Sequence, residues 1–385
     1  MFSRMDRPIR AAVIGTGFIG AVHIDALRRL GVELAGVLGS SRERGRLRAN
    51  ELGVHHSYGS LDELLADASV DVVHITSPNN QHAAQAHAVI AAGKHVVCEK
   101  PLATSSNDAR SLLAAANAAG IVHCVNFNQR FYPQAQEMAA RVRDGSVGDV
   151  RLVSGSYLQD WLLEDTDWNW RLDDAIGGPL RAVGDIGSHW LDLASFVSGL
   201  TVESVMADLV TVHPTRLAPA GPVETYASAS GDTTPHQIRT EDVANLLVRF
   251  EGGGRGALTL SQVSPGRKNR LWLEVDGSND ALAWCNETPD ELWIGHRGRP
   301  SELSQRDPSL LSPLAQQSTW HPGGHAEGFP DTFRALYRAV YADILAGQPS
   351  PHPTYPTFAD GLTQVLIGDA VLASAASSTW APVST

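Results

Sequence analysis

The first clear structural element of the chain is the stretch IRAAVIGTGFIG, which runs from Ile9 to Gly20. A short apolar run there ends in glycines spaced as GxGxxG, and a helical pattern follows from Ala21 to Leu30. In this context Gly15 permits a tight turn, Gly17 lets a pyrophosphate approach the backbone, and Gly20 lets helix and strand pack closely. The helix N-terminus adds free amides and a partial positive charge. The stretch predicts a dinucleotide site, with an ordinary glycine-rich turn as the alternative.

Strand and helix patterns alternate through the first third of the chain. After the first strand, apolar strands are expected at residues 32–38, 70–75, 95–98 and 121–125. Helices are expected at residues 42–52, 61–66 and 107–119, with an Ala-rich helix that ends near residue 92. Apolar strands separated by helices imply a parallel sheet covered on both faces. We therefore expect an α/β fold with a doubly wound Rossmann sheet.

The pattern changes after about residue 130. Alternating segments at 150–157, 243–250, 256–262 and 271–275 predict an antiparallel sheet. Helical spacing is found at 137–143, 329–344 and 357–375, and residues 213–237 are expected to form an excursion loop. We predict a dinucleotide-binding domain at 1–130 and an α+β domain for substrate binding and oligomerisation at 131–385.

Composition restricts the class of protein. The chain has 385 residues, 43% of them apolar and 19% charged, and its net charge of −12 disfavours nucleic acid as a partner. No apolar run is long enough for a membrane span, and the N-terminal sequence gives no sign of a secretory signal. Cys98, Cys124 and Cys285 are few and lack CxxC spacing, which favours a reducing compartment, the cytoplasm.

The end of the second expected strand bears on the choice of dinucleotide. An acidic residue that binds the ribose is expected there, but the sequence continues Gly39-Ser40-Ser41-Arg42. Hydroxyls and a guanidinium can hold a 2′-phosphate, which favours NADP slightly. Ser40 can also bind a 2′-hydroxyl, and Arg42 can simply begin a helix. The prediction is therefore NAD(P).

The segment GKHVVCEKPLATS, from Gly93 to Ser105, ends an apolar strand on two opposite charges and a proline. Lys100 lies at the carboxyl end of a parallel strand, where ligands of doubly wound sheets bind, and Pro101 holds it extended. The alternative is a strand-end ion pair with Glu99. The turn after residue 75 shares this edge, and its side chains either touch the cofactor or cap a helix. The expected cofactor contacts are Gly15, Thr16, Gly17, Phe18, Ile19, Gly20, Ser40, Ser41, Arg42, Thr76, Pro78, Asn79, His82, Glu99 and Lys100.

A second charged pair occurs in the segment GGPLRAVGDIGSHWLDL, from Gly177 to Leu193. If Asp185 opens a helix, Asp185 and His189 lie one turn apart on one face. Histidine is the usual proton carrier near neutral pH, and the carboxylate can orient it. A capping aspartate with a packing histidine is the alternative.

These motifs, GTGFIG, SPNNQH, CEKP and GGPLRAVGDIGSHWLD in this order, resemble the Gfo/Idh/MocA oxidoreductase family over nearly the whole chain. The resemblance implies a nucleotide domain, a second domain with a large open sheet, and hydride transfer between NAD(P) and a hydroxyl-bearing carbon of a sugar or cyclitol. It implies that Lys100 is catalytic or substrate-binding, that His189 accepts the proton and that Asp185 contacts substrate. The stretch FNQRF from Phe127 to Phe131 also resembles the family, whereas Gly39 departs from it.

Aromatic and amide side chains are dense at residues 157–161 and 166–171. Such groups suit a sugar, although a domain or subunit interface has a similar composition. The segment 321–327, with two histidines, is a second candidate wall. We expect no metal, because hydride transfer with a lysine and a histidine needs none. The expected substrate contacts are Lys100, Asn128, Arg130, Gln159, Trp161, Trp170, Arg171, Asp185, His189 and His325.

The leading hypothesis is an NAD(P)-dependent dehydrogenase of a sugar, glycoside, anhydrosugar or cyclitol, with His189 as acid/base and Lys100 stabilising the reacting oxygen. One alternative is an NAD-dependent glycoside hydrolase that uses transient ring oxidation and elimination. Another is a non-catalytic dinucleotide-binding sensor. An open sheet also predicts a homo-oligomer, a dimer or a tetramer.

Overall fold

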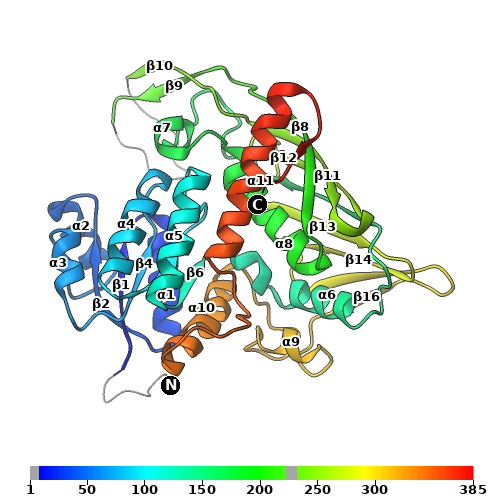
Figure 1. The fold of residues 1–385 in the computed structure, drawn as a ribbon, viewed down its shortest axis with the longest axis horizontal. Coiled ribbons are helices and arrows are strands. Elements are labelled where there is room, and N and C mark those ends of the chain that lie inside the picture. The colour runs from blue at the N-terminus through cyan, green and yellow to red at the C-terminus, as the bar shows by residue number, and fades with distance from the viewer. Residues whose placement is uncertain (1–7, 222–231, 385) are drawn as a thin grey trace. The chain divides into compact units, whose positions relative to one another are not determined.

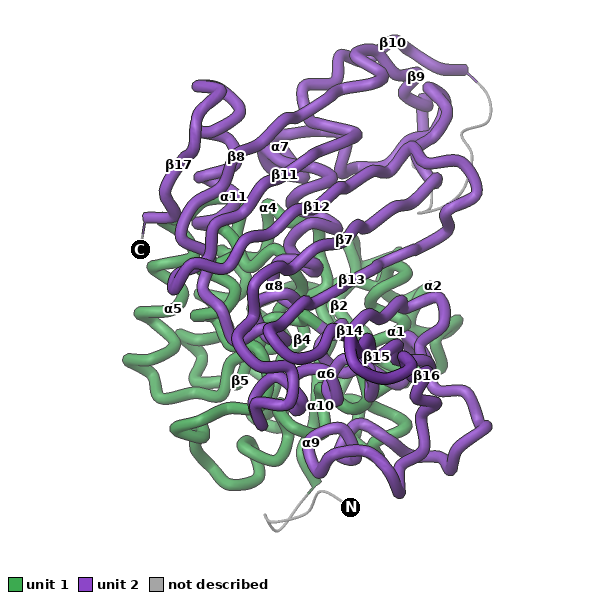
Figure 2. Tube along the Cα trace, turned by 90° about the vertical axis from the view of Figure 1, so that its right-hand side faces the viewer, with its two compact units in different colours: residues 1–127, 333–365 green, residues 128–332, 366–385 purple. Residues whose placement is uncertain are grey.

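The computed structural model describes residues 8–221 and 232–384. The chain forms two compact units, one of residues 1–127 with 333–365 and the other of residues 128–332 with 366–385 (Figure 2). No helix in the described part of the chain combines the length and apolar character that a membrane crossing requires.

The first unit contains a six-stranded sheet in the order β3-β2-β1-β4-β5-β6, with every pair parallel (Figure 1). This order reverses between β1 and β4, as in dinucleotide-binding sheets. The strands are β1 (Arg10–Ile14), β2 (Glu33–Leu38), β3 (Ser57–Tyr58), β4 (Val72–Ile75), β5 (His95–Cys98) and β6 (His123–Val125). The predicted doubly wound Rossmann sheet is confirmed.

Helices connect these strands, namely α1 (Phe18–Arg29), α2 (Arg42–Glu51), α3 (Leu61–Ala66), α4 (Asn79–Ala91) and α5 (Ser106–Ala119). Serine side chains cap the N-termini of α2, α3 and α5. Each hydroxyl, of Ser41, Ser60 and Ser105, accepts a hydrogen bond from a backbone amide of the first turn. Val73 and Ile75 of β4 face one apolar cluster with α4 and α5. His74 faces the opposite side of the sheet, where it contacts α1 and α10 (Phe329–Ala346).

The division of the chain differs from the predicted one. The first break falls between Phe127 and Asn128, close to the predicted residue 130, but residues 333–365 belong to the first unit rather than to the second. They include most of α10 (Phe329–Ala346), whose Tyr337 and Tyr341 pack against His74, and the first turns of α11 (Phe358–Ser377). Helical periodicity predicts these helices but does not reveal which sheet they cover.

The second unit contains a nine-stranded sheet in the order β16-β15-β14-β13-β7-β12-β11-β8-β17, antiparallel except for the pair β7 and β12. Its strands are β7 (Leu152–Leu158), β8 (Val202–Val210), β11 (Val243–Phe250), β12 (Arg255–Ser261), β13 (Arg270–Asp276), β14 (Asp280–Cys285), β15 (Glu291–His296), β16 (Glu302–Gln305) and β17 (Ala381–Pro382). The predicted mostly antiparallel sheet is confirmed.

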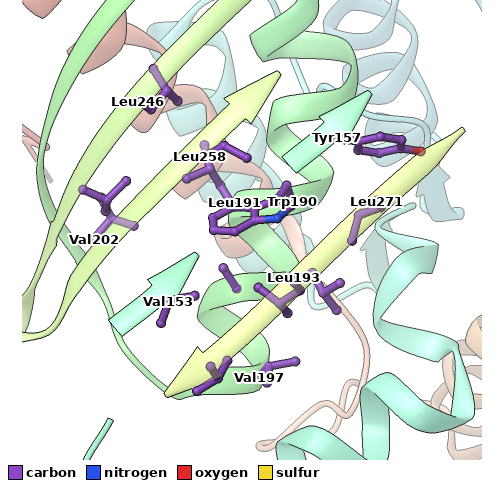
Figure 3. Close-up of a cluster of buried hydrophobic side chains, with 14 of the residues drawn as sticks. Val153, Tyr157, Trp190, Leu191, Leu193, Val197, Val202, Leu246, Leu258 and Leu271 are labelled. Carbon is purple, nitrogen blue, oxygen red and sulfur yellow. The ribbon is translucent and has the colours of Figure 1, made fainter. Parts of the chain in front are cut away.

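Helices cover one face of this sheet. They are α6 (Pro133–Arg143), α8 (Ser188–Ser198) and the second part of α11, with the shorter α7 (Asp174–Gly177) and α9 (Pro313–Gln316) elsewhere in the unit. Trp190, Leu191 and Leu193 of α8 meet Val153, Leu258 and other strand residues in one apolar cluster (Figure 3). The indole of Trp190 is fully buried and donates a hydrogen bond to the carbonyl of Trp272, 2.8 Å away.

The predicted excursion loop is wrong at its ends, because β9 (Thr215–Pro219) and β10 (Thr233–Gln237) pair as an antiparallel ribbon. Residues 222–231 of the prediction lie outside the described residues. Buried Arg216 anchors β9 through the carbonyls of Leu162 and Glu164 and the carboxylate of Asp242. The segment lacks the alternating apolar residues that predict a strand. Its sequence therefore does not indicate that β9 forms, since β9 is anchored by the buried charge of Arg216.

Candidate active site

The glycine-rich turn after β1 depends on close backbone contacts. Gly15 has φ of +92°, and a Cβ on it would lie 2.6 Å from the carbonyl oxygen of Thr76. A Cβ on Gly20 would lie 2.2 Å from the Gly15 carbonyl oxygen. Only glycine at position 20 therefore allows α1 to approach the end of β1 this closely. A Cβ on Gly17 would meet nothing within 4 Å. The backbone at Gly17 is therefore open to a ligand, as a pyrophosphate requires.

The start of α1 suits an anion. No side chain caps the helix at Gly17, and no acidic residue lies in its first turn. The helix dipole thus presents its positive end without a competing carboxylate. These residues fit the pyrophosphate of a dinucleotide.

The end of β2 explains why Gly39 replaces an acid. A Cβ there would lie 2.5 Å from the Cα of Gly45, because α2 packs directly on the strand end. Ser41 caps α2 by accepting a hydrogen bond from the Arg44 amide, and the Arg42 guanidinium lies 3.7 Å from the Glu63 carboxylate. Two of the three candidate 2′-phosphate ligands, Ser41 and Arg42, thus have protein partners.

The turn after β4 is fixed on both sides. The hydroxyl of Thr76 donates to the carbonyls of Ile14 and Gly15, at 2.8 and 2.9 Å. His82, buried in the first turns of α4, places Nε2 2.8 Å from the Ser77 carbonyl and Nδ1 2.7 Å from the Pro101 carbonyl. Burial lowers the pKa of His82, against the opposing effect of these two carbonyls. His82 therefore bridges the turn after β4 and the turn after β5, while its predicted contact with cofactor stays a prediction.

The turn after β5 carries Lys100, which is half-buried and precedes a cis peptide bond to Pro101. Glu99 is 7% exposed, and its Oε2 accepts a hydrogen bond from the backbone amide of Lys100 at 3.1 Å. Its Oε1 accepts from the amide of Asn126 and lies 3.2 Å from Nε2 of His23. The Glu99 carboxylate thus holds the turn after β5 through several hydrogen bonds. The usual polarity of residues at a strand end does not account for these contacts.

In the second unit, Asp185 lies in a π-helical turn (Val183–Gly187) that leads into α8 at Ser188. The expectation that Asp185 opens a regular helix is therefore corrected. Its Oδ2 accepts a hydrogen bond from Gln262 at 2.9 Å, and its Oδ1 lies 3.3 Å from Nε of Arg171. His189, in the first turn of α8, is 8% exposed. Wide helical turns of this kind occur frequently at functional sites.

A buried charged cluster lies behind Asp185. Arg181 donates to Gln262 at 3.1 Å and pairs with Asp242, which Arg216 also contacts. The Glu241 carboxylate accepts from the backbone amide of Arg181, and burial raises its pKa. Two guanidiniums and two carboxylates balance in charge, which makes their burial tolerable. This cluster is not among the residues predicted from the sequence, although Arg181 within the motif and the adjacent charges of Glu241 and Asp242 were visible signals.

Some of the predicted substrate residues lie together in the second unit. Gln159 accepts from the indole of Trp161 and donates to Asn269, both at 2.8 Å. Arg171 stacks over Trp170, with its guanidinium carbon 4.3 Å from the ring centroid, and reaches Asp185. These pairs pre-arrange aromatic surfaces and polar groups of the type that bind sugars.

Three other predicted substrate residues have structural partners. Asn128 is buried and donates to the Thr332 hydroxyl at 2.8 Å, and Arg130 forms a two-point ion pair with Asp192. His325 is exposed, in a loop whose carbonyls buried Arg306 holds. Their contact with substrate stays a prediction. In the described ranges, no group of three or more His, Cys, Asp or Glu side chains is arranged to hold a metal ion.

The sheet order and the glycine turn define a dinucleotide-binding protein, and comparisons with known proteins identify it as an NAD-binding oxidoreductase. Residues 9–127 match the family model described as "Oxidoreductase family, NAD-binding Rossmann fold", and residues 135–283 match the GFO/IDH/MocA C-terminal domain. The chain belongs to the Gfo/Idh/MocA family, and the predicted resemblance is confirmed.

Its relatives include characterised dehydrogenases. The chain is 27% identical to levoglucosan dehydrogenase of Pseudarthrobacter phenanthrenivorans, over 97% of this chain and 98% of the relative. A solved levoglucosan dehydrogenase in complex with NADH and levoglucosan has a TM-score of 0.88 at 26% identity, over 98% of this chain and 100% of that one. An oxidoreductase from Sinorhizobium meliloti has a TM-score of 0.81 at 31% identity, over 97% and 99%. The chain is therefore an NAD-binding enzyme whose family acts on sugars and cyclitols.

The contrast between Gly17 and Gly20 gives a direct test of the cofactor site. Because a Cβ on Gly17 has open space, Gly17→Ala should change stability by about 0.5 kcal/mol or less. It should weaken NAD binding by about tenfold or more, since the methyl group occupies the backbone approach. Tryptophan fluorescence titration and thermal melting measure the two effects.

Gly20→Ala is the matched control. Its Cβ would clash with the Gly15 carbonyl oxygen at 2.2 Å, so this variant should lower the melting temperature, with overpacking costing about 1–3 kcal/mol. NAD binding to Gly17→Ala with wild-type affinity would show that the dinucleotide does not use this turn.

Proposed function

We propose that this protein oxidises a hydroxyl-bearing ring carbon of a sugar, glycoside, anhydrosugar or cyclitol, with NAD as the acceptor. The observation that carries the proposal is the full-length match to levoglucosan dehydrogenase, a family member solved with NADH and an anhydrosugar. Levoglucosan is therefore the first compound to test. The bound dinucleotide supplies the hydride acceptor.

The proposal assigns a chemical role to residues of both units. His189 removes the proton of the substrate hydroxyl, and Lys100 donates a hydrogen bond to the same oxygen as negative charge develops. Asp185 contacts a substrate hydroxyl through a carboxylate that Gln262 and Arg171 hold in one orientation. Gln159 and Trp161 contribute an amide and an aromatic face for a sugar ring.

The first test measures the reduced-nicotinamide absorbance with levoglucosan, other anhydrosugars, glycosides and cyclitols. Lys100→Ala and His189→Ala should each lower kcat by about a hundredfold or more, as loss of a proton carrier or oxygen ligand does. Exposed Lys268→Ala and His352→Ala are the matched controls and should retain activity.

The same assay separates the alternatives. Near-full turnover in both Lys100→Ala and His189→Ala would disprove the mechanism. Glycoside cleavage without matching accumulation of NADH would favour transient oxidation and elimination, and cofactor binding with no deuterium transfer from any substrate would favour a sensor.

For the cofactor, we infer that NAD binds more tightly than NADP. The Glu63 carboxylate accepts from the Gly59 amide at 2.7 Å and lies 3.7 Å from Arg42, so its negative charge would oppose a phosphate bound by Arg42. NAD and NADP dissociation constants, measured in parallel, should differ by about tenfold or more. Glu63→Gln should narrow that difference. Tighter binding of NADP to the wild-type protein would contradict the inference and favour Ser40, Ser41 and Arg42 as phosphate ligands.

We also infer that a second copy of the chain covers the outer face of the nine-stranded sheet. Strand pairing places residues of neighbouring strands side by side in one row across this face. Four residues of the row are apolar and exposed: Met206, Leu247, Trp293 and Leu303. Exposed apolar surface on this scale is typical of an interface. The helices described above cover only the opposite face.

Leu247→Asp should therefore reduce the oligomer, a dimer or a tetramer, to smaller species in light scattering coupled to size-exclusion chromatography. Leu47→Asp, at a leucine of α2 that is 57% exposed compared with 49% for Leu247, is the matched control and should leave the mass unchanged. A wild-type protein that is monomeric at all concentrations would disprove this assembly.

A further inference from the structure

Five buried polar side chains of the first unit converge on Glu99. They come from α1, β4, the residue after β6 and α10, and none is more than 1% exposed: His23, His74, Asn126, Tyr337 and Tyr341. With so little exposed surface, these side chains cannot touch a substrate. Burying five polar groups is unfavourable unless each has a partner, so their arrangement requires a reason beyond packing.

The first branch of this network runs from α10 through β4 and α1 to Glu99. The Tyr341 hydroxyl lies 3.0 Å from Nε2 of His74, and Nδ1 of His74 lies 3.0 Å from Nδ1 of His23. Nε2 of His23 then lies 3.2 Å from Oε1 of Glu99. Tyr341 and Glu99 are thus joined by three consecutive contacts through two imidazoles.

The second branch starts one helical turn earlier on α10. The Tyr337 hydroxyl donates to Oδ1 of Asn126 at 3.2 Å, and the amide nitrogen of Asn126 donates to Oε1 of Glu99. Both branches therefore end on the same carboxylate oxygen. The other oxygen, Oε2, accepts from the backbone amide of Lys100.

The Glu99 carboxylate and a neutral His23 ring together fix the direction of every hydrogen bond in the first branch. An ionised Glu99 only accepts, so Nε2 of His23 carries a proton, and in a neutral ring Nδ1 of His23 then accepts. Nδ1 of His74 must then donate, and Nε2 of His74 accepts from the Tyr341 hydroxyl. Burial is the main cause that holds the pKa of His74 well below its usual range, which agrees with a neutral ring. All donors in the branch point toward Glu99.

We propose that His23 and His74 are positioning residues for Lys100, which they act on through Glu99. The two branches hold the Glu99 carboxylate in one orientation, and its Oε2 holds the backbone of Lys100 at the start of the turn after β5. This inference rests on the proposed function, because Lys100 is there the ligand of the reacting oxygen. Small displacements of such a group cost rate rather than cofactor affinity.

The network has the properties of a positioning device rather than of a stabilising core. An apolar cluster of similar volume would stabilise the sheet equally well or better, whereas linked hydrogen bonds select one geometry. The backbone amide of Glu99 also donates to the carbonyl of Ile75 at 2.9 Å, so the carboxylate and the main chain together define where Lys100 begins.

The closing experiment first reads the Lys100 backbone without any assay of activity. The chain has three lysines, Lys94, Lys100 and Lys268, so ¹⁵N-lysine labelling gives three backbone amide signals. Tyr341→Phe and His74→Phe should accelerate hydrogen exchange of the Lys100 amide and shift its resonance, and should leave the other two unchanged. Tyr341→Phe removes one hydroxyl only and keeps the test valid if His74→Phe does not fold.

The second readout is kinetic. Both variants should lower kcat by about tenfold, with the NAD dissociation constant and the substrate KM within about twofold of wild type. Tyr355→Phe is the matched control, because Tyr355 is a buried tyrosine of the same unit whose hydroxyl bonds Asp343 instead of this network. It should lose stability without changing the Lys100 signal or kcat.

Two outcomes overturn the inference. One is a Lys100 amide signal that is the same in wild type, Tyr341→Phe and His74→Phe. The other is a kcat that falls no further in these variants than in Tyr355→Phe. If the wild-type protein oxidises no polyol, the proposed function fails instead, and the amide signals still decide whether the histidines hold the Lys100 backbone.

Discussion

The first unit depends on one close approach, that of the Gly15 backbone to Thr76 and Gly20. No side chain fits between these groups, so the ends of β1 and β4 and the start of α1 are held at backbone contact. Strand pairing then carries this geometry outward, since Ile75 pairs with Cys98 and the Glu99 amide donates to the Ile75 carbonyl. The glycine turn and the Lys100 turn are therefore parts of one rigid edge. That rigidity lets Gly17 remain open to a ligand.

In each unit, a side chain proposed to act on substrate is held from behind by buried polar groups. Glu99, which its two branches orient, accepts a hydrogen bond from the Lys100 backbone amide. Gln262 donates to Asp185 and accepts from Arg181, which pairs with Asp242. Buried charge is costly unless hydrogen bonds or opposite charges compensate it. Hydrogen bonds compensate Glu99, and two guanidiniums balance the charge of Asp242. The networks fix orientation, which an apolar core cannot do for a carboxylate, and this is what a hydrogen-bonding site for a polyhydroxylated ligand requires.

The sequence predicts the local structure well where one rule acts alone. The expected strands at 95–98 and 243–250 have the observed limits, and GxGxxG predicts the turn that the structure contains. The sequence does not predict the structure where contacts between residues far apart in the chain determine it. Residues 333–365 join the first unit through contacts with His74 and His23, and β9 is held by Arg216, whose partners lie 26 and more positions away. The π-helical turn at Asp185 has no signature in side-chain periodicity, because its extra backbone step leaves the apolar pattern of α8 intact.

The residues of the buried network around Glu99 were not predicted, but the sequence contained a signal for them. Tyr337 lies on the apolar face of a predicted helix, and a buried tyrosine requires a partner for its hydroxyl. His74 interrupts the apolar strand Val72–Ile75, and a buried histidine likewise requires partners for two ring nitrogens. Neither signal names its partner, since Tyr341 and His74 are 267 positions apart. Taken together they are informative, because unsatisfied donors on one buried element can be met only by acceptors on another. A polar residue on an otherwise apolar face therefore indicates a long-range contact, and its chemistry restricts what the contact is.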